Sequence, residues 1–233
     1  MPLAGKGMLL TSMDIAAAHE ADFNRWYDCE YLEERVAIDG FIEARRYVAH
    51  AASPKYLCLY STATLDVLDS PAYRARLANP TDWSRRTMAR FENMIRVVAR
   101  VTISRGTGRG VALGIVRLRA SPDNAKQLRD ALREKLAPER LDGIISMHLL
   151  ESDAALSGPT AEIPSVRNAG ASDWYVLIDG TCVHAVSSVI AERFTGPAAA
   201  PSALPMSVGT YCLMWDLTKS DIRNDVRSGI ARA

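Results

Sequence analysis

The order of predicted strands and helices occurs twice along this chain of 233 residues. Alternating apolar runs predict first-half strands near 7–13, 41–49, 56–61 and 94–103, and second-half strands near 111–118, 144–151, 173–179 and 208–217. Helical periodicity predicts helices over about 15–36, 66–77 with a break at Ser70-Pro71, 81–91, 121–136 and 182–194, the first of them capped by Asp14. Asp39-Gly40 and Asp142-Gly143 mark the same turn in both halves. Internal duplication is therefore the feature that most constrains the fold.

Each half follows the order β-α-β-β-α-β, which predicts an α+β fold of two tandem ferredoxin-like units. Helices would cover only one face of each sheet, leaving an apolar face bare. Packing the two bare faces together buries that area at ~25 cal/mol per Å². We therefore expect an intrachain pseudo-dimeric α/β barrel. The predicted boundaries are a first domain over 1–104, a glycine-arginine linker over 105–110, a second domain over 111–218 and a tail over 219–233.

The composition of the chain argues against several classes of protein. The 28 lysines and arginines almost balance the 27 aspartates and glutamates, which argues against nucleic-acid binding. No apolar run approaches the length of a membrane span. The 4 cysteines lie far apart without a CxxC pair, which predicts buried free thiols and a cytoplasmic protein. No His, Cys and Asp spacing resembles a metal site.

The stretch FNRWYDCEYLEER, 23–35, is the candidate functional segment, together with the following strand GFIEARRYVAH, 40–50. Adjacent aromatics, carboxylates and paired arginines are what a pocket for a small polar aromatic molecule requires. The predicted ligand-binding residues are Trp26, Tyr27, Glu30, Arg45 and Tyr60. The predicted catalytic residues are Tyr31, Arg46 and His148.

Each of these assignments has an alternative. One of Trp26 and Tyr27 would serve core packing instead. Arg46 would form an ion pair with Glu30 or Glu34 rather than bind a ligand. His148, inside the predicted barrel, would be either an acid-base group or a hydrogen-bonded core histidine. If Arg46 lines a pocket, Arg46→Ala should leave folding nearly intact and weaken binding by ~1.5–3 kcal/mol.

The segments FNRWYDCEYLEERVAIDGFIEARRYVA, PKYLCLYS, SPAYR and NPTDWSRR resemble the dimeric α/β-barrel superfamily, and within it the EthD-like group. The resemblance covers about the first hundred residues, and the second half matches mainly in element order. Members usually carry a WYD-x-x-H motif, from which this chain departs by having Tyr31 in place of the histidine. A phenol with a pKa near 10 is a weak base at neutral pH. The superfamily includes cofactor-independent oxygenases, isomerases, cyclases and haem enzymes, so the resemblance does not select a reaction.

Two functions follow as expectations. The first is a cofactor-independent isomerase, lyase or cyclase that uses acid-base chemistry on a small aromatic or polyketide-like substrate. The alternative is a non-catalytic small-molecule binding or assembly module, which a closed core around Tyr31 would favour. Haem held by His148 and His184 is the alternative cofactor, and a homodimer is an alternative to a monomer. The long polar stretch 152–172 should cover a pocket mouth or contact another subunit.

Overall fold

The computed structural model describes residues 3–121, 123–160, 163, 172–196 and 205–222. The strands of the first half are β1 (Gly7–Ile15), β2 (Phe41–Ala51), β3 (Tyr56–Thr62) and β4 (Phe91–Gly106). Its helices are η1 (Ala17–His19), α1 (Glu20–Trp26), the π-helical η2 (Tyr27–Tyr31), α2 (Leu32–Val36), η3 (Leu65–Asp69), α3 (Pro71–Ala78) and α4 (Asp82–Met88).

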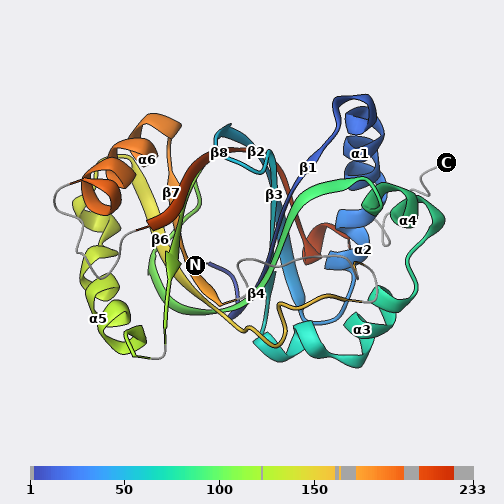
Figure 1. Ribbon diagram of the computed structural model, residues 1–233, viewed down its shortest axis with the longest axis horizontal. Coiled ribbons are helices and arrows are strands. Elements are labelled where there is room, and N and C mark those ends of the chain that lie inside the picture. Colours follow the sequence, from blue (N-terminus) through green and yellow to red (C-terminus); the bar gives the residue numbers. More distant parts are fainter. Residues whose placement is uncertain (1–2, 122, 161–162, 164–171, 197–204, 223–233) are drawn as a thin grey trace.

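The second half repeats the order. Its strands are β5 (Ala112–Arg119), β6 (Ile144–Ser152), β7 (Asp173–Gly180) and β8 (Pro205–Thr218). Its helices are α5 (Ala125–Lys135), η4 (Pro138–Arg140), α6 (Val183–Ile190) and the π-helical η5 (Ala191–Thr195). Figure 1 shows the helices of the two halves on opposite outer sides of a central barrel.

The strands form one closed barrel in the order β1-β3-β2-β8-β5-β7-β6-β4. Within it, β4-β1-β3-β2 and β8-β5-β7-β6 are the same ferredoxin-like order. Antiparallel pairing of β2 with β8 and of β4 with β6 joins the halves, so no sheet edge stays open. The prediction of two tandem ferredoxin-like units forming an intrachain pseudo-dimeric barrel is confirmed.

The two halves agree in detail at the turn before their second strands. Gly40 and Gly143 both have positive φ, at 88° and 73°, a conformation that favours glycine. A register shift follows in each half, after which Glu43 pairs with Ser61 and Ser146 with Asp179. Two residues further along each strand, Arg45 and His148 therefore occupy equivalent positions, both facing the lumen.

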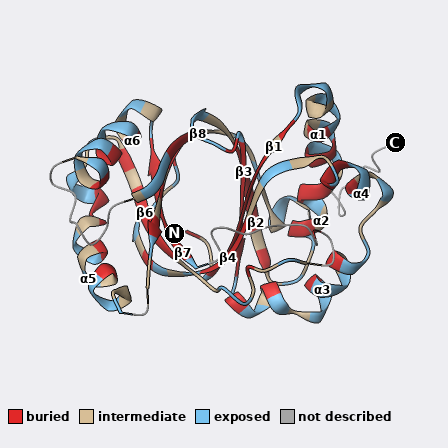
Figure 2. Cartoon of the chain, viewed as in Figure 1, coloured by how far each residue is buried: buried red, intermediate tan, exposed pale blue. Residues whose placement is uncertain are grey.

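Three separate cores stabilise the molecule, and Figure 2 shows the strands as its most continuously buried part. One core lies between the first-half helices and the outer face of their sheet, and a second lies in the same place in the other half. The third fills the barrel lumen and includes Leu3, Met8, Leu10, Tyr47, Leu57, Leu59, Val97, Leu113, Tyr175, Leu177 and Tyr211. Alternate strand residues thus point into the lumen or out to the helices.

Some local predictions were wrong. Asp14 is not a helix cap but lies in β1, where its carboxylate accepts from the Lys55 backbone N–H at 2.6 Å and from the Asn93 amide at 2.8 Å. The linker predicted over 105–110 overlaps β4, because bulged pairing with β6 extends that strand to Gly106. The cysteines are free as predicted, but only Cys58 is buried, whereas Cys29 and Cys182 are exposed and Cys212 is partly exposed.

Segments of the second half reach over the first half. The Lys219 ammonium donates to the carbonyls of Val36, Ala37 and Ile38, which end α2. In the long segment after β6, the Ser157 hydroxyl accepts from the Val98 N–H at 2.9 Å, and Ile163 lies in the first-half core. The predicted loop 152–172 is partly outside the described residues, and its described part packs on the first half.

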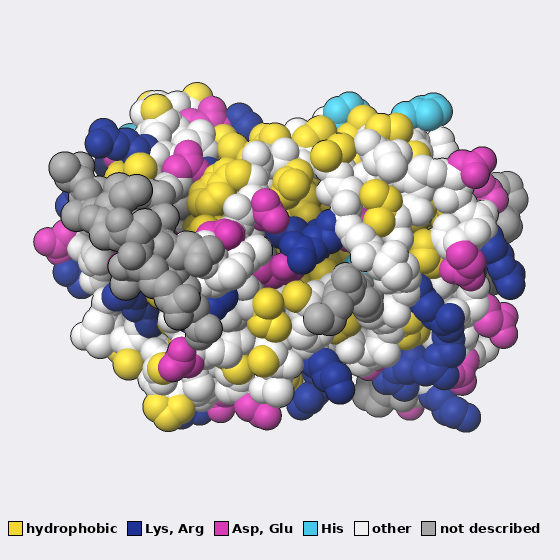
Figure 3. Space-filling model, turned by 180° about the vertical axis from the view of Figure 1, so that it is seen from behind, with side chains coloured by type: hydrophobic (Ala, Val, Ile, Leu, Met, Phe, Trp, Pro, Cys, Tyr) yellow, Lys and Arg dark blue, Asp and Glu magenta, His cyan; other side chains and the backbone are white. Residues whose placement is uncertain are grey.

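The surface carries mixed charge. On the face in Figure 3, Lys and Arg side chains lie among Asp and Glu side chains and hydrophobic patches. Within the described ranges, no helix is long and apolar enough to cross a membrane.

Candidate functional site in the first half

The structure divides the predicted site residues into two groups on opposite faces of the sheet. The outer group lies between the first-half helices and the sheet and comprises Trp26, Tyr27, Glu30, Tyr31, Arg46 and Tyr60. The inner group lies in the barrel lumen and comprises Arg45 and His148. Tyr31, Arg46 and His148 therefore do not form one catalytic centre.

The outer group is positioned by a helix that changes its winding. After α1, the backbone becomes π-helical over η2 and returns to α-helix in α2. This widened turn directs both Tyr27 and Tyr31 towards the sheet, with 1% and 7% of their surfaces exposed. Such π-helical insertions are rare and often occur at functional sites.

Aromatic rings form the wall of the site. Trp26 packs against Tyr31 at a centroid distance of 4.2 Å and edge-on to Tyr27 at 4.9 Å. Phe23 adds an edge contact to Tyr27 at 5.0 Å. We refer to these four rings, with Tyr60 beneath them on β3, as the aromatic layer. Trp26 and Tyr27 are both buried, with 0% and 1% of their surfaces exposed, so both residues contribute to the packing of the core.

Arg46 is embedded in this layer rather than exposed in a pocket. Its guanidinium lies over the Tyr27 ring at 4.4 Å, and its Nη1 donates to the half-exposed Asp28 carboxylate at 2.8 Å. Its Nη2 donates to Asn24 Oδ1 at 2.5 Å. The predicted alternative of an ion pair with Glu30 or Glu34 is wrong, because Asp28 lies nearer and Glu34 pairs with Arg76. Complete burial of Arg46 argues against the expectation that Arg46→Ala leaves folding nearly intact, because the variant would leave a cavity and an unpaired partner.

Glu30 anchors the helix to α4. Its carboxylate accepts from the hydroxyls of Thr81 at 2.5 Å and Ser84 at 3.2 Å. The Ser84 hydroxyl in turn accepts from the Trp26 indole N–H at 3.1 Å. Glu30 therefore acts on the aromatic layer through Ser84, by fixing the orientation of Trp26.

Polar groups converge on the sheet side of the aromatic layer. The Tyr60 hydroxyl lies beside the Cys58 thiol and is completely buried, without a hydrogen-bond partner of normal geometry among the described residues. Arg35 is buried too, with its guanidinium 4.4 Å from the Tyr31 ring. The Tyr27 hydroxyl contacts two sulfur groups, which are weak hydrogen-bond partners: the Met13 sulfur at 3.8 Å and the Cys58 thiol.

Burial keeps these groups protonated. Desolvation raises the pKa of Tyr27 and of Tyr60 well above the usual value of a phenol. It also raises the pKa of the Cys58 thiol to about 11, despite the opposing effect of the Arg46 charge. At neutral pH the cluster therefore offers hydrogen-bond donors and positive charge, and neither a thiolate nor a phenolate.

The inner group forms part of an ion network across the two halves. The Arg45 Nη1 donates to the Asp179 carboxylate at 3.0 Å, with both side chains at most 1% exposed. Glu43 lies 4.0 Å from the Arg45 Nε and accepts from the Arg109 guanidinium at 2.6 Å. The Arg45–Asp179 ion pair therefore connects β2 of the first half with β7 of the second half, two strands that are not adjacent in the barrel.

His148 is placed as a core histidine. Its Nδ1 lies 2.9 Å from the Ser104 hydroxyl and its Nε2 lies 3.0 Å from the Ser146 hydroxyl. Burial, together with the nearby Arg45 charge, lowers the pKa of His148 to about 3. A neutral imidazole that is 1% exposed does not serve as a general acid at neutral pH.

The described residues do not fit haem ligated by His148 and His184. His148 is inside the lumen with both ring nitrogens near serine hydroxyls, whereas His184 is exposed on α6 outside the barrel. The sheet therefore separates the two imidazoles. Among the described residues no cluster of His, Cys, Asp and Glu could hold a metal ion.

Several site residues were missed from the sequence. Arg35 lies four residues after Tyr31, and this helical spacing was an available signal. Cys58 lies two residues before Tyr60 on the same strand face, which strand alternation indicates. Trp215, whose indole donates to Asp28 at 2.9 Å, comes from β8 of the other half and had no local signal.

Comparisons with known proteins establish the fold. Neither a family model nor a curated protein sequence matches this chain. An anthrone oxidase-like protein is similar in structure, with a TM-score of 0.61 and 8% identity over 92% of this chain and 93% of its own. A candidate monooxygenase from Lactobacillus acidophilus NCFM gives a TM-score of 0.54 and 9% identity, covering 92% and 97%. A haem-binding protein from Thermus thermophilus gives 0.50 and 12%, covering 97% of each chain.

At these identities the likeness concerns the fold and not the reaction. The comparisons therefore confirm the fold that the predicted resemblance implies.

Proposed function

We propose that the chain binds a small aromatic molecule bearing a carbonyl or ionised oxygen, between the η2 segment and the outer face of the first-half sheet. One observation carries this proposal. The Tyr60 hydroxyl is completely buried, and apart from the Cys58 thiol, a weak hydrogen-bonding group, it has no partner among the described residues. Leaving such a group unpaired costs about 1–3 kcal/mol, a cost that a ligand oxygen would remove.

The surrounding chemistry suits an oxygen that carries or develops negative charge. Tyr60 and Tyr27 are protonated donors, and the Arg35 and Arg46 guanidiniums add positive charge near them. Donors fixed in a buried site stabilise an enolate or phenolate more strongly than water does. Enolate-type intermediates are common to isomerase, lyase and cyclase reactions on aromatic or polyketide-like ketones, which is the reaction class we propose. The proton on carbon passes to a water molecule that enters with the ligand, and the donors stabilise the enolate that remains.

Access to the site requires the helix to move, because the aromatic layer is closely packed. Tyr31 has the highest exposure of its tyrosines, at 7%, and lies at the end of the π-helical turn. We propose that η2 shifts away from the sheet when a ligand binds, with Tyr31 moving from the Trp26 face to the ligand. The Tyr31 hydroxyl then becomes a further donor.

The helix motif supports placing the first half with the EthD-like group. Trp26, Tyr27 and Asp28 match the WYD portion of that motif, whereas Tyr31 replaces the usual histidine. In the described site, Asp28 orients Arg46 rather than facing the buried donors. The proposed mechanism therefore relies on charge stabilisation and does not use a helix histidine.

A second candidate is the non-catalytic binding module. Two observations favour it. The core around Tyr31 is closed, as expected for such a module, and the buried groups are protonated, since Tyr27, Tyr60 and Cys58 all have raised pKa values. Glu30, the carboxylate predicted to bind ligand, is already held by Thr81 and Ser84. A site of this kind binds an oxygen without a group that removes a proton from carbon.

Titration with 1-tetralone, a bicyclic aromatic ketone with exchangeable α-protons, tests both candidates. We expect saturable binding that Tyr60→Phe weakens about 3- to 10-fold, the scale of one hydrogen bond. Tyr47→Phe is the matched control, because it removes another completely buried hydroxyl without a partner, from the lumen. Tetralin, which lacks the carbonyl, should bind equally to the parent and Tyr60→Phe.

The same mixture in D₂O separates enzyme from module. Accelerated exchange of the α-protons, followed by NMR, supports enolate formation, and Tyr31→Phe should then lower the exchange rate more than the affinity. Binding without faster exchange supports the module. Equal affinity for 1-tetralone in the parent and Tyr60→Phe contradicts the proposed site in either form.

A further inference from the structure

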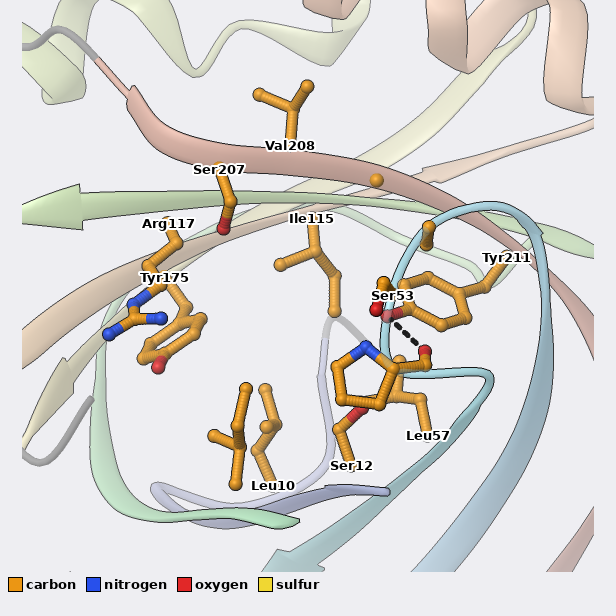
Figure 4. A pocket seen from close by; sticks show the side chains of 14 residues that line it. Leu10, Ser12, Ser53, Leu57, Ile115, Arg117, Tyr175, Ser207, Val208 and Tyr211 are labelled. Carbon is orange, nitrogen blue, oxygen red and sulfur yellow. Dashed lines mark hydrogen bonds between the residues drawn. The ribbon is translucent and has the colours of Figure 1, made fainter. Parts of the chain in front are cut away.

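A hollow lies at the mouth of the barrel, away from the aromatic layer. It has a volume of about 40 Å³ and opens between the β2–β3 turn and the first residues of β8. Leu10, Leu57 and Ile115 form its apolar part, and Figure 4 shows Tyr175 and Arg117 on one side with Ser53 and Tyr211 on the other. Both halves of the chain therefore contribute to the lining.

A polar group of the hollow lacks a partner. The Tyr175 side chain is 3% exposed, and its hydroxyl makes no hydrogen bond within the described part of the chain. By contrast, the hydroxyl of Tyr211 in the same lining donates to the Pro54 carbonyl at 3.1 Å. Burial raises the pKa of Tyr175 to about 12, so its O–H remains a donor at neutral pH.

Two guanidiniums lie on the same side of the mouth as this hydroxyl. Arg117 and Arg119 both pair with the carboxylate of Asp173, each with a shortest N–O distance of 2.6 Å. Arg117 lines the hollow directly, with 16% of its side chain exposed.

We propose that the barrel mouth is a second ligand site, which takes the carboxylate head of a small organic acid. The carboxylate accepts from the Tyr175 hydroxyl in the positive field of Arg117, and the first carbons of the ligand contact Leu10 and Ile115. A volume of about 40 Å³ holds such a head group, and the rest of the molecule extends through the opening. A few polar groups within apolar walls are typical of small-molecule sites. This site is independent of the one proposed in the aromatic layer.

Butyrate is the probe for this site, and n-butylamine, which has a similar size and the opposite charge, is the control ligand. Methyl NMR should show saturable shifts at Leu10, Leu57 and Ile115 with butyrate and not with n-butylamine. Tyr175→Phe removes only an unpaired hydroxyl, so it should fold like the parent and lower the affinity for butyrate about tenfold. Arg117→Gln, in which Arg119 still pairs with Asp173, should also lower the affinity for butyrate.

Tyr47→Phe serves as the matched control, because it removes a buried hydroxyl without a hydrogen-bond partner among the described residues, outside the lining of the hollow. It should bind butyrate like the parent. The proposal is overturned if butyrate causes no saturable shifts, if Tyr175→Phe binds it as tightly as the parent, or if the shifts fall on the first-half core instead. None of these results bears on 1-tetralone binding, so the two proposals fail separately.

Discussion

Breaking the Arg45–Asp179 pair should strongly destabilise the protein. The guanidinium and carboxylate are 3.0 Å apart, from opposite halves, and both are at most 1% exposed. At an effective dielectric constant of about 20, their Coulomb attraction is ~5 kcal/mol before desolvation is counted. Removing one partner leaves the other buried, so Arg45→Met should lower the free energy of unfolding by about 3–5 kcal/mol. This loss should lower the urea concentration at the midpoint of unfolding by ~1–2 M.

The double variant provides the sharper result. In Arg45→Met with Asp179→Leu, neither charge remains, and a buried pair replaced by apolar groups is often nearly neutral in stability. The double variant should therefore be at least about 2 kcal/mol more stable than the sum of the two single losses predicts. Arg74→Met is the matched control, because Arg74 pairs with Asp69 on the surface, at 64% and 45% exposure. Additive losses in the double variant would refute a pair across the two halves.

Three further predictions follow from the described contacts. Burial lowers the pKa of His148 to about 3 in the folded protein, from 6.5 in the unfolded chain. Between these two pH values, His148 is protonated in the unfolded chain and neutral in the folded protein. The free energy of unfolding should therefore fall by about 1.4 kcal/mol per pH unit as the pH drops from 6.5 towards 3. His148→Gln should flatten that fall in urea titrations at several pH values, and an unchanged slope would exclude His148 as its source. In thermal or urea unfolding, Arg46→Met should lower the free energy of unfolding by about 2–4 kcal/mol. Asp28→Asn should lower it much less, because Asp28 is half exposed. Equal losses in the two variants would contradict this prediction. Ile163→Ala should cost about 2–3 kcal/mol if the segment after β6 packs on the first-half core, whereas no loss in the same assay would show that it does not.

The fold was predictable because its signals are local and repeated. Gly40 and Gly143 each mark the turn that starts a second strand, and His148 lies inside the barrel as expected. Arg45, which was predicted to bind a ligand together with Trp26 and Tyr27, instead lies on the same lumen face as His148. Buried strands joined by short turns admit few topologies once duplication is recognised. The closed barrel then follows from the need to cover two apolar sheet faces.

The partners of the polar residues were not predictable in the same way. Asp179 lies 134 residues from Arg45, and Trp215 lies 187 residues from Asp28, so neither contact has a local pattern. The sequence suggested that the helix carboxylates of Glu30 or Glu34 pair with Arg46 on the following strand. In the structure Asp28, which lies in the π-helical turn, pairs with Arg46 instead. Ion-pair geometry depends on a backbone irregularity that helical periodicity does not reveal.

The crystal structure of the complex with 1-tetralone tests the central claim most directly. We predict that the bicyclic ring lies between η2 and the sheet, against the Trp26 and Tyr27 rings, with its carbonyl oxygen within hydrogen-bond distance of the Tyr60 hydroxyl. Tyr31 should have moved away from Trp26, whose ring it contacts at 4.2 Å in the unliganded protein. A ligand bound at the barrel mouth, or an aromatic layer unchanged by saturating 1-tetralone, would contradict the account.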